Sequence, residues 1–201
     1  MKKITLLILA ILVGFSLAAC GTMVKAVEKA VSDKQASEEN GEGEDGGEAG
    51  AALQTITSAE SSLTLSFPKA WKVYHGELHD DASIEIANPA KEQYMIVLEE
   101  SAEDFVEGFN VDDYLEIFLE GMVEGIDLEV EPVIQPAKFG KDGLDARQAR
   151  MSGAVDSIKV EYFLVCAEVN GIFYQVIAWS LPSRFDAAKP LYDEVIASAT
   201  F

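Results

Sequence analysis

Hydrophobic residues fall into two regions of the chain, with a polar stretch between them. The first region is an apolar run over residues 4–17, interrupted only by a few small or polar residues. Residues 37–52 are mostly glycine, alanine and glutamate, a composition that cannot bury a core and that predicts an extended tether. The second region, which starts at Leu53 or Glu60 and reaches Phe201, has the apolar spacing of strands and helices and the length of one domain.

Alternating apolar and polar positions predict four strands in the first part of this domain, with a turn at Asn88-Pro89 before the last of them. These strands are Leu63–Phe67, Trp71–Tyr74, Ser83–Ala87 and Tyr94–Leu98. A helix follows, because Asn110 can cap it, with Asp113 three residues later. Its apolar stripe consists of Val111, Tyr114, Leu115, Phe118, Leu119, Met122, Val123 and Ile126.

Strand patterns return in the last part of the chain and end in a helix. The expected strands are Leu128–Ile134, Leu144–Met151, Ser157–Val169 and Ile172–Leu181. The last two flank Asn170-Gly171, a dipeptide typical of a two-residue hairpin turn. The final helix begins near Ser183, and we expect it to be interrupted or to restart at Pro190, which cannot donate a helical hydrogen bond.

The hairpin around Asn170-Gly171 is apolar on both faces. In its first strand Leu164 and Val165 point to opposite sides, and both have apolar neighbours two residues away. A sheet with one wet face would alternate more cleanly. We therefore predict an α+β fold in which helices cover both faces, a three-layer α/β/α sandwich around a mainly antiparallel sheet.

The start and end of the domain resemble a known family. The segment Phe67-Pro-Lys-Ala-Trp71 is similar to the strand–Pro–x–x–Trp start of Mog1/PsbP-like domains, and the long hairpin followed by a closing helix also fits. The resemblance implies that fold and an accessory or binding role, since members of this family act mostly as binding proteins. It supplies no catalytic residues to this chain.

The N-terminal residues resemble the export signal of bacterial lipoproteins. Two lysines precede the apolar run, which is too short to span a bilayer, and Leu17-Ala-Ala-Cys20 is similar to a lipobox. The resemblance implies a signal peptide over residues 1–19 and a lipid-modified Cys20 at the start of the mature chain. We then expect residues 20–59 to be the lipidated N-terminus and tether, and residues 60–201 to be the globular domain.

Charge and cysteine content exclude several classes of function. The full chain has 15 basic and 35 acidic residues, a net charge of −20, which disfavours nucleic acid and anionic lipid surfaces as partners. With Cys20 lipidated, Cys166 is left without a disulfide partner. It lies in an apolar run with no nearby base, so we expect a buried thiol and not a nucleophile.

His75 and His79 are the only histidines of the chain and stand close to three acidic residues. Imidazole and carboxylate groups suit zinc or a similar cation, which makes these residues candidate metal ligands. The alternative is a polar loop between strands. Gly76 argues against a helix that would align the two rings, and no distant histidine can complete the site, so the sequence favours the loop and no cofactor.

Together these features predict a membrane-held, outward-facing lipoprotein whose domain is a non-catalytic accessory module. It would bind a protein or an envelope component and would be attached to the membrane through Cys20. The alternative is a carrier of a small molecule or cation that works with a membrane transporter. The sequence has no nucleophile elbow, P-loop or dinucleotide-binding motif, and so we expect no enzyme.

Overall fold

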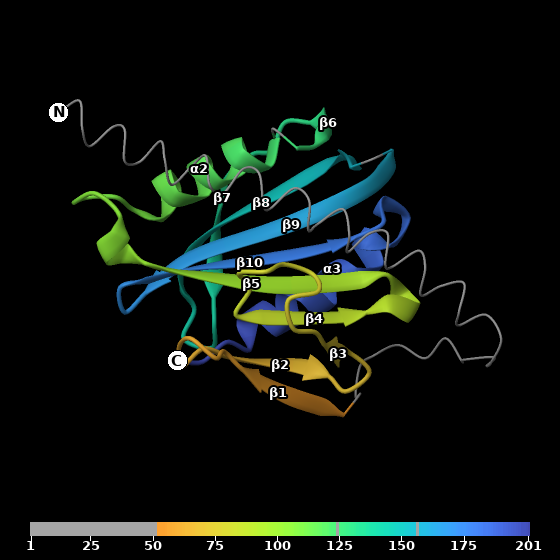
Figure 1. Ribbon diagram of the computed structural model, residues 1–201, viewed down its shortest axis with the longest axis horizontal. Helices are drawn as coiled ribbons and strands as arrows, with labels where there is room; N and C mark the ends of the chain where they lie inside the picture. The colour runs from red at the N-terminus through yellow and green to blue at the C-terminus, as the bar shows by residue number, and fades with distance from the viewer. Residues whose placement is uncertain (1–51, 124, 156) are drawn as a thin grey trace.

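The computed structural model describes residues 52–201, apart from residues 124 and 156 (Figure 1). The strands are β1 Leu53–Thr57, β2 Thr64–Pro68, β3 Lys72–Val73, β4 Ile84–Asn88, β5 Gln93–Ser101, β6 Asp127–Val130, β7 Gln135–Phe139, β8 Leu144–Val155, β9 Ile158–Val169 and β10 Ile172–Ser180. The helices are the short 3₁₀ helices η1 Pro89–Lys91 and η2 Ala102–Asp104, and the α-helices α2 Val111–Val123 and α3 Pro182–Ala197. Within the described part of the chain, none of the helices has the length and apolar content needed to span a membrane.

Eight strands form one sheet with the order β3-β4-β5-β10-β9-β8-β6, and β7 also pairs with β8. Strands β1 and β2 form a separate two-stranded sheet. The registered strand pairs are antiparallel in both sheets. The described part of the chain is therefore rich in sheet and contains two α-helices, and the predicted antiparallel pairing is confirmed.

The hairpin of β9 and β10 lies at the centre of the large sheet. Asn170 and Gly171 have φ angles of 54° and 77°, and a type I′ turn needs positive φ at both central positions. The two strands stay in register from the pair Val169–Ile172 to the pair Glu161–Ser180. The predicted hairpin is confirmed.

The two faces of this hairpin pack into separate hydrophobic clusters. One cluster joins Val165 and Val176 to helix α3 and to the β1–β2 sheet. The other joins Leu164 and Ile177 to helix α2. Figure 1 shows α3 behind the large sheet in this view. The two helices therefore belong to different hydrophobic clusters, which lie on opposite sides of the central strands.

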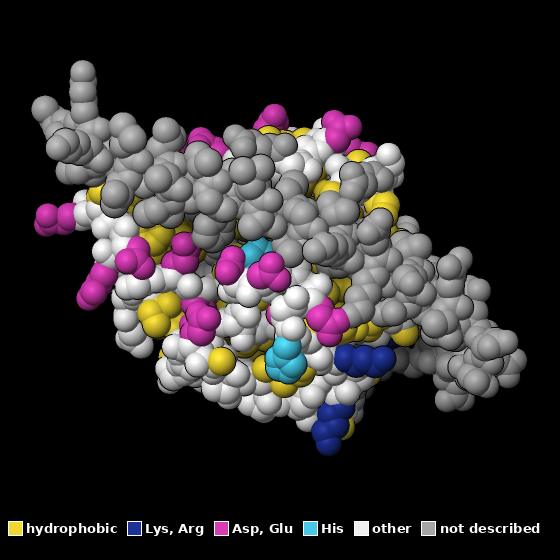
Figure 2. Space-filling model, in the orientation of Figure 1, with side chains coloured by type: hydrophobic (Ala, Val, Ile, Leu, Met, Phe, Trp, Pro, Cys, Tyr) yellow, Lys and Arg dark blue, Asp and Glu magenta, His cyan; other side chains and the backbone are white. Residues whose placement is uncertain are grey.

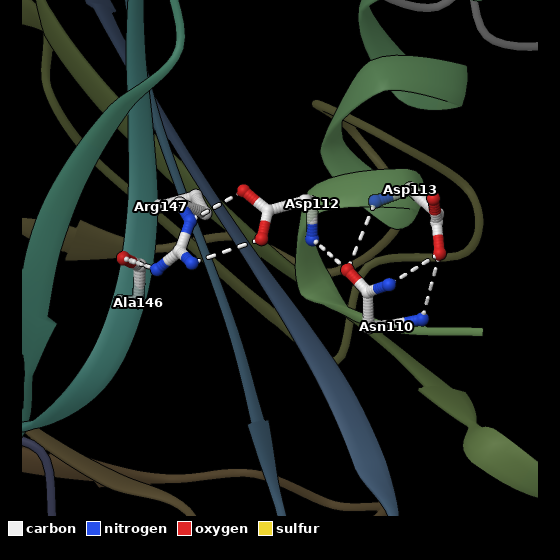
Figure 3. A network of polar contacts seen from close by, with 5 residues as sticks. All are labelled: Asn110, Asp112, Asp113, Ala146 and Arg147. Carbon is white, nitrogen blue, oxygen red and sulfur yellow. Dashed lines mark hydrogen bonds and ion pairs between the residues drawn. The ribbon is translucent and has the colours of Figure 1, made fainter. Parts of the chain in front are cut away.

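Helix α2 has the cap and the apolar face that its sequence indicates. The side chain of Asn110 accepts hydrogen bonds from the backbone N–H groups of Asp112 and Asp113, and Asp113 accepts one from the backbone of Asn110 (Figure 3). Tyr114, Leu115 and Leu119 are buried, and the rest of the predicted stripe packs against the same cluster. The reciprocal cap satisfies backbone donors that would otherwise lack partners at the helix start.

Helix α3 corrects one prediction, because it is continuous over Pro182–Ala197 and contains Pro190 within it. A proline inside a helix removes one backbone hydrogen bond and costs about 3 kcal/mol. Phe185 and Tyr192, on either side of Pro190, are both fully buried in the same cluster. Burial of both halves of the helix against one sheet face keeps the chain helical across the proline.

The strand expected at Leu128–Ile134 is also wrong in its extent. Strand β6 ends at Val130, residues 131–134 leave the sheet, and the unpredicted strand β7 then begins at Gln135. Pro132 lies in the interruption and has no N–H to donate. Strand β8 is twelve residues long and pairs with β6 at one end and with β7 at the other, so it can accommodate both short strands.

The described fold includes residues that the sequence placed in the tether. Strand β1 begins at Leu53 and pairs with β2 over five positions, within the range of residues 20–59 assigned to the lipidated N-terminus and tether. Ile56 packs against the hydrophobic cluster of α3. Of the two starts that the sequence offers, Leu53 and Glu60, the ordered strand favours Leu53.

Candidate functional site

The candidate site is a surface depression of about 450 Å³ beside the start of helix α2. We call it the α2 depression, and its lining residues are Val106, Glu107, Gly108, Phe109, Asp113, Glu116, Ile117 and Glu120. One wall is the tight turn that follows η2, and the other is the exposed side of α2. The site therefore depends on how the chain passes from strand β5 into the helix.

Glycine at position 108 sets the shape of the turn. The backbone N–H of Phe109 donates to the carbonyl of Val106 at 3.0 Å, and Gly108 between them has a φ of 87°. This is the turn position that requires positive φ, which glycine adopts without strain. As a result Val106 lies at the surface with 51% of its area exposed, one of the few large apolar side chains so exposed among the described residues.

A rigid aromatic group supports the depression from below. The ring of Phe109 stacks on that of Phe105, with centroids 4.6 Å apart and an interplanar angle of 6°. Both rings meet Tyr114 and Phe173 edge-on, at centroid distances between 5.3 and 6.4 Å. Such edge-to-face arrangements are favourable for aromatic rings, so the apolar floor of the site is held in place before any partner arrives.

A polar network lies beneath this aromatic group. The Tyr114 hydroxyl donates to the carboxylate of Glu100, and the Gln175 amide donates to the Tyr114 hydroxyl at 2.5 Å. Burial raises the pKa of Glu100, although the hydrogen bond from Tyr114 opposes the rise. Burial and the neighbouring Glu100 also raise the pKa of Tyr114, so the phenol stays protonated and remains a donor. These bonds fix the first turn of α2 to strands β5 and β10.

An ion pair connects the same end of the helix to strand β8. The guanidinium of Arg147 contacts both carboxylate oxygens of Asp112, at 2.5 and 2.9 Å (Figure 3). Two-point contacts of this kind fix orientation as well as distance. Arg147 is thus occupied by Asp112, which lies outside the lining of the depression.

The surroundings of the α2 depression are strongly acidic. From residue 92 to residue 137 the chain has fourteen acidic residues and no lysine, arginine or histidine. Figure 2 shows acidic side chains around hydrophobic atoms at the left of the molecule, where Figure 1 places the segment between β5 and α2. No lysine or arginine is among the residues that line the site. The depression therefore combines an apolar floor with an acidic rim.

A second depression of about 450 Å³ lies on the α3 side, and we call it the α3 groove. It is lined by Glu131, Val133, Gln135, Gln148, Ala149, Arg150, Ser152, Glu161, Phe163 and Lys189. Buried Glu161 accepts hydrogen bonds from both Arg150 and Ser152, and Lys189 pairs with Asp193. The two cations of this groove are therefore neutralised within the protein.

The structure does not bring His75 and His79 together into a metal centre. His75 is exposed, whereas His79 is 3% exposed and its Nδ1 accepts the backbone N–H of Asp81. Burial lowers the pKa of His79 against the opposing charges of nearby acids. In residues 52–201, without 124 and 156, no group of three or more histidine, cysteine or acidic side chains is arranged to hold a metal ion.

Glu85 explains the shape of this histidine loop. Its carboxylate is 3% exposed and accepts hydrogen bonds from three successive backbone N–H groups of the loop, those of residues 76–78. A buried carboxylate held in this way is satisfied by its own chain. The loop is thus closed by an internal interaction, in agreement with the interpretation of a polar loop between strands.

Of the two cysteines, only Cys166 lies among the described residues. Cys20 and the predicted signal peptide lie outside the described residues. Cys166 is 1% exposed in the cluster of α2, and burial raises the pKa of its thiol. The predicted burial of Cys166 in the core is confirmed.

Sequence reasoning missed the residues that line the α2 depression. Val106 and Phe109 were not part of a predicted element, and Gly108 was not singled out. Two signals were present: a glycine between two apolar residues in a polar segment, and the long acidic stretch without a basic residue. Neither signal indicates by itself that the apolar and acidic groups meet on one surface.

No protein-family model matches the chain, and no curated protein matches it. Among solved structures, the fold is similar to that of cyanobacterial PsbP (CyanoP) from Synechocystis sp. PCC 6803. The TM-score is 0.57 at 14% identity, and the match covers 79% of this chain and 97% of that chain. This chain has a PsbP-like fold.

Two further solved structures are similar to this chain at lower TM-scores. A protein from Bacteroides thetaiotaomicron VPI-5482 has a TM-score of 0.50 at 12% identity, over 73% of this chain and 47% of that chain. LpqN, involved in cell envelope biogenesis of Mycobacterium tuberculosis, has a TM-score of 0.49 at 13% identity, over 74% of this chain and 90% of that chain. At 12% identity, the likeness to the Bacteroides protein is one of fold alone.

Proposed function

We propose that this chain is a lipid-anchored accessory module on the extracytoplasmic side of a membrane, and that it binds a partner protein without catalysing a reaction. The anchor would be Cys20, after removal of residues 1–19 as a signal peptide. We also propose that the PsbP-like fold is a three-layer α/β/α sandwich of the Mog1/PsbP type. The separate clusters of α2 and α3 on the two sheet faces support this layering.

The proposal of partner binding rests on the α2 depression. It exposes Val106 on a tight turn and supports Phe109 on a packed aromatic group, so an apolar contact surface is present without rearrangement. Aromatic and aliphatic groups that are fixed in advance contribute most to association, because little conformational freedom is lost on binding.

The α3 groove gives less support to the alternative, a carrier of a small molecule or cation. Its volume of about 450 Å³ lies within the usual range of ligand pockets. However, Arg150, Glu161 and Lys189 already bond to side chains of the protein, so a ligand would have to displace these contacts. A partner could contact the apolar residues of the α2 depression without displacing ion pairs of this kind.

Site-specific photo-crosslinking in native membranes tests the proposal. A photoreactive amino acid at Val106 of the full chain should capture a partner protein, whereas the same residue at exposed Glu194 on α3 should not. Val106→Asp should abolish recovery of that partner by pull-down. Val73→Asp is the matched control, since Val73 is also an exposed valine but lies on β3. Equal capture at both positions, or no capture at Val106, would contradict the proposed function.

The anchor has a separate test. Cys20→Ser should move the protein from the membrane fraction to the soluble fraction, because two or three acyl chains hold a protein far more firmly than its surface can. Membrane association that persists in Cys20→Ser would refute lipid attachment at this residue without bearing on the α2 depression.

A further inference from the structure

From the charges that surround the apolar floor of the α2 depression, we infer that its partner presents a basic amphipathic helix. This inference rests on the proposed function and specifies the chemistry of the partner at the same site. Acidic residues alone are common on soluble proteins. The combination with an exposed apolar floor is what selects a partner that is both cationic and apolar.

Acidic groups lie on the turn and the helix that line the depression, and also on η2 just before the turn. Glu103 and Asp104 are exposed on η2, and Glu107 lies on the turn. On the helix, Glu116 and Glu120 line the depression beside Ile117. Within the described part of the chain, the carboxylates of Glu107, Glu116 and Glu120 make no hydrogen bond or ion pair with another side chain. The negative charge of the rim is therefore available to a partner.

The spacing on helix α2 indicates a partner of helical shape. Asp113, Glu116, Ile117 and Glu120 follow the i, i+3, i+4, i+7 pattern and share one side of the helix. The line from the first to the last covers about 10 Å, at a rise of 1.5 Å per residue. A helix with lysines or arginines three and four residues apart presents positive charge with the same period, and an apolar side chain between them can contact Ile117 and Phe109.

Among the described residues, the cation that pairs with α2 does not neutralise this rim. Arg147 is held by both oxygens of Asp112, outside the lining of the depression. A negatively charged lipid surface or a nucleic acid would be repelled by the same rim. A basic protein segment can pair its positive charges with the acidic rim and pack apolar side chains on the floor.

A binding measurement with a defined probe tests the inference. The probe is a synthetic helix of about 15 residues made of leucine, alanine and lysine, with lysines spaced three and four apart, and its binding to the full chain is followed by fluorescence anisotropy. The double change Glu116→Gln with Glu120→Gln should weaken binding about tenfold, as expected for the loss of two partly exposed charge contacts. Added salt should weaken binding by the unmodified protein.

A matched control separates local recognition from the general negative charge of the protein. Asp142→Asn with Glu194→Gln removes the same two charges from exposed positions on the β7–β8 turn and α3, and should change the affinity less than about twofold. Equal weakening in the two double variants would overturn the inference. So would displacement of the probe by millimolar calcium, because the rim would then be a cation site.

Two further outcomes are distinct. If Lys25→Gln, Lys29→Gln and Lys34→Gln in the full chain raise the affinity for the probe, the occupant is the stretch of this chain that carries these three lysines, and the inference of a partner helix is wrong. If photo-crosslinking at Val106 captures a partner whose binding is unaffected by Glu116→Gln with Glu120→Gln, the proposed function stands and the basic character of the partner is refuted.

Discussion

At the scale of single residues, Glu100 and His79 make the stability of the protein depend on pH in opposite directions. Burial raises the pKa of Glu100 above its ordinary value of 4.5 and lowers the pKa of His79 below its ordinary value of 6.5. The folded state therefore favours protonated Glu100 and neutral His79. The stability linked to Glu100 is lost as the pH rises through its folded pKa, and that linked to His79 is lost as the pH falls through its folded pKa.

Glu100→Gln should remove the first of these effects. Glutamine can still accept the hydrogen bond from Tyr114 but cannot ionise, so the variant should gain stability relative to the unmodified protein as the pH rises from about 4.5 to about 7. Urea unfolding at both pH values measures this difference. Glu107→Gln, at an exposed position, is the control. A difference between wild type and Glu100→Gln that does not change with pH would contradict the prediction.

Gly153→Ala should destabilise the protein because the backbone leaves no room for a side chain. A Cβ atom at position 153 would lie 2.2 Å from a methyl carbon of Ile126 and 2.9 Å from the carbonyl oxygen of Asp127. Overpacking of this kind costs about 1–3 kcal/mol of unfolding free energy. Gly121→Ala, where a Cβ meets nothing within 4 Å, should instead stabilise helix α2 by about 0.5–1 kcal/mol. Denaturant titration of both variants checks the opposite signs.

At the scale of elements, sequence patterns located nearly every strand and both α-helices of the described residues. Burial of one or two faces of an element requires apolar residues at a regular spacing, and this spacing is visible in the sequence. The patterns failed where a boundary depends on a distant partner. Strand β1 was not among the predicted strands, and its pairing with β2 gives it structure. Strand β7 was missed because Pro136 lies in it, a residue tolerated at the edge of a sheet.

Removal of β1 should therefore lower stability. The side chain of Gln54 donates to the carbonyl of Trp71 at 2.7 Å, and Ile56 packs on the cluster of α3. A truncated chain that begins at Glu60 loses these contacts together with the five registered pairs, and should unfold at a lower temperature than one that begins at Ala52. Circular dichroism melts of the two chains measure the difference. Coincident midpoints would show that β1 does not contribute to the fold.

At the scale of the whole molecule, the candidate site was much less predictable than the fold. The sequence directed attention to His75 and His79, the two histidines of the chain, and the structure separates them into an exposed and a buried position. The α2 depression arises instead from common residues. Val106 and Phe109 acquire a role because a turn and a helix bring them beside Glu116 and Glu120.

The sequence by itself determined the periodic features of this protein: the two-faced hairpin, the capped amphipathic helix, and the negative charge. These features depend on neighbours within a few residues or on composition, and both can be read directly along the chain. The tertiary structure decided where strands end, how α3 stays continuous through Pro190, and which surface combines apolar and acidic groups. Those outcomes depend on contacts between segments far apart in the sequence, and local spacing carries no record of such contacts.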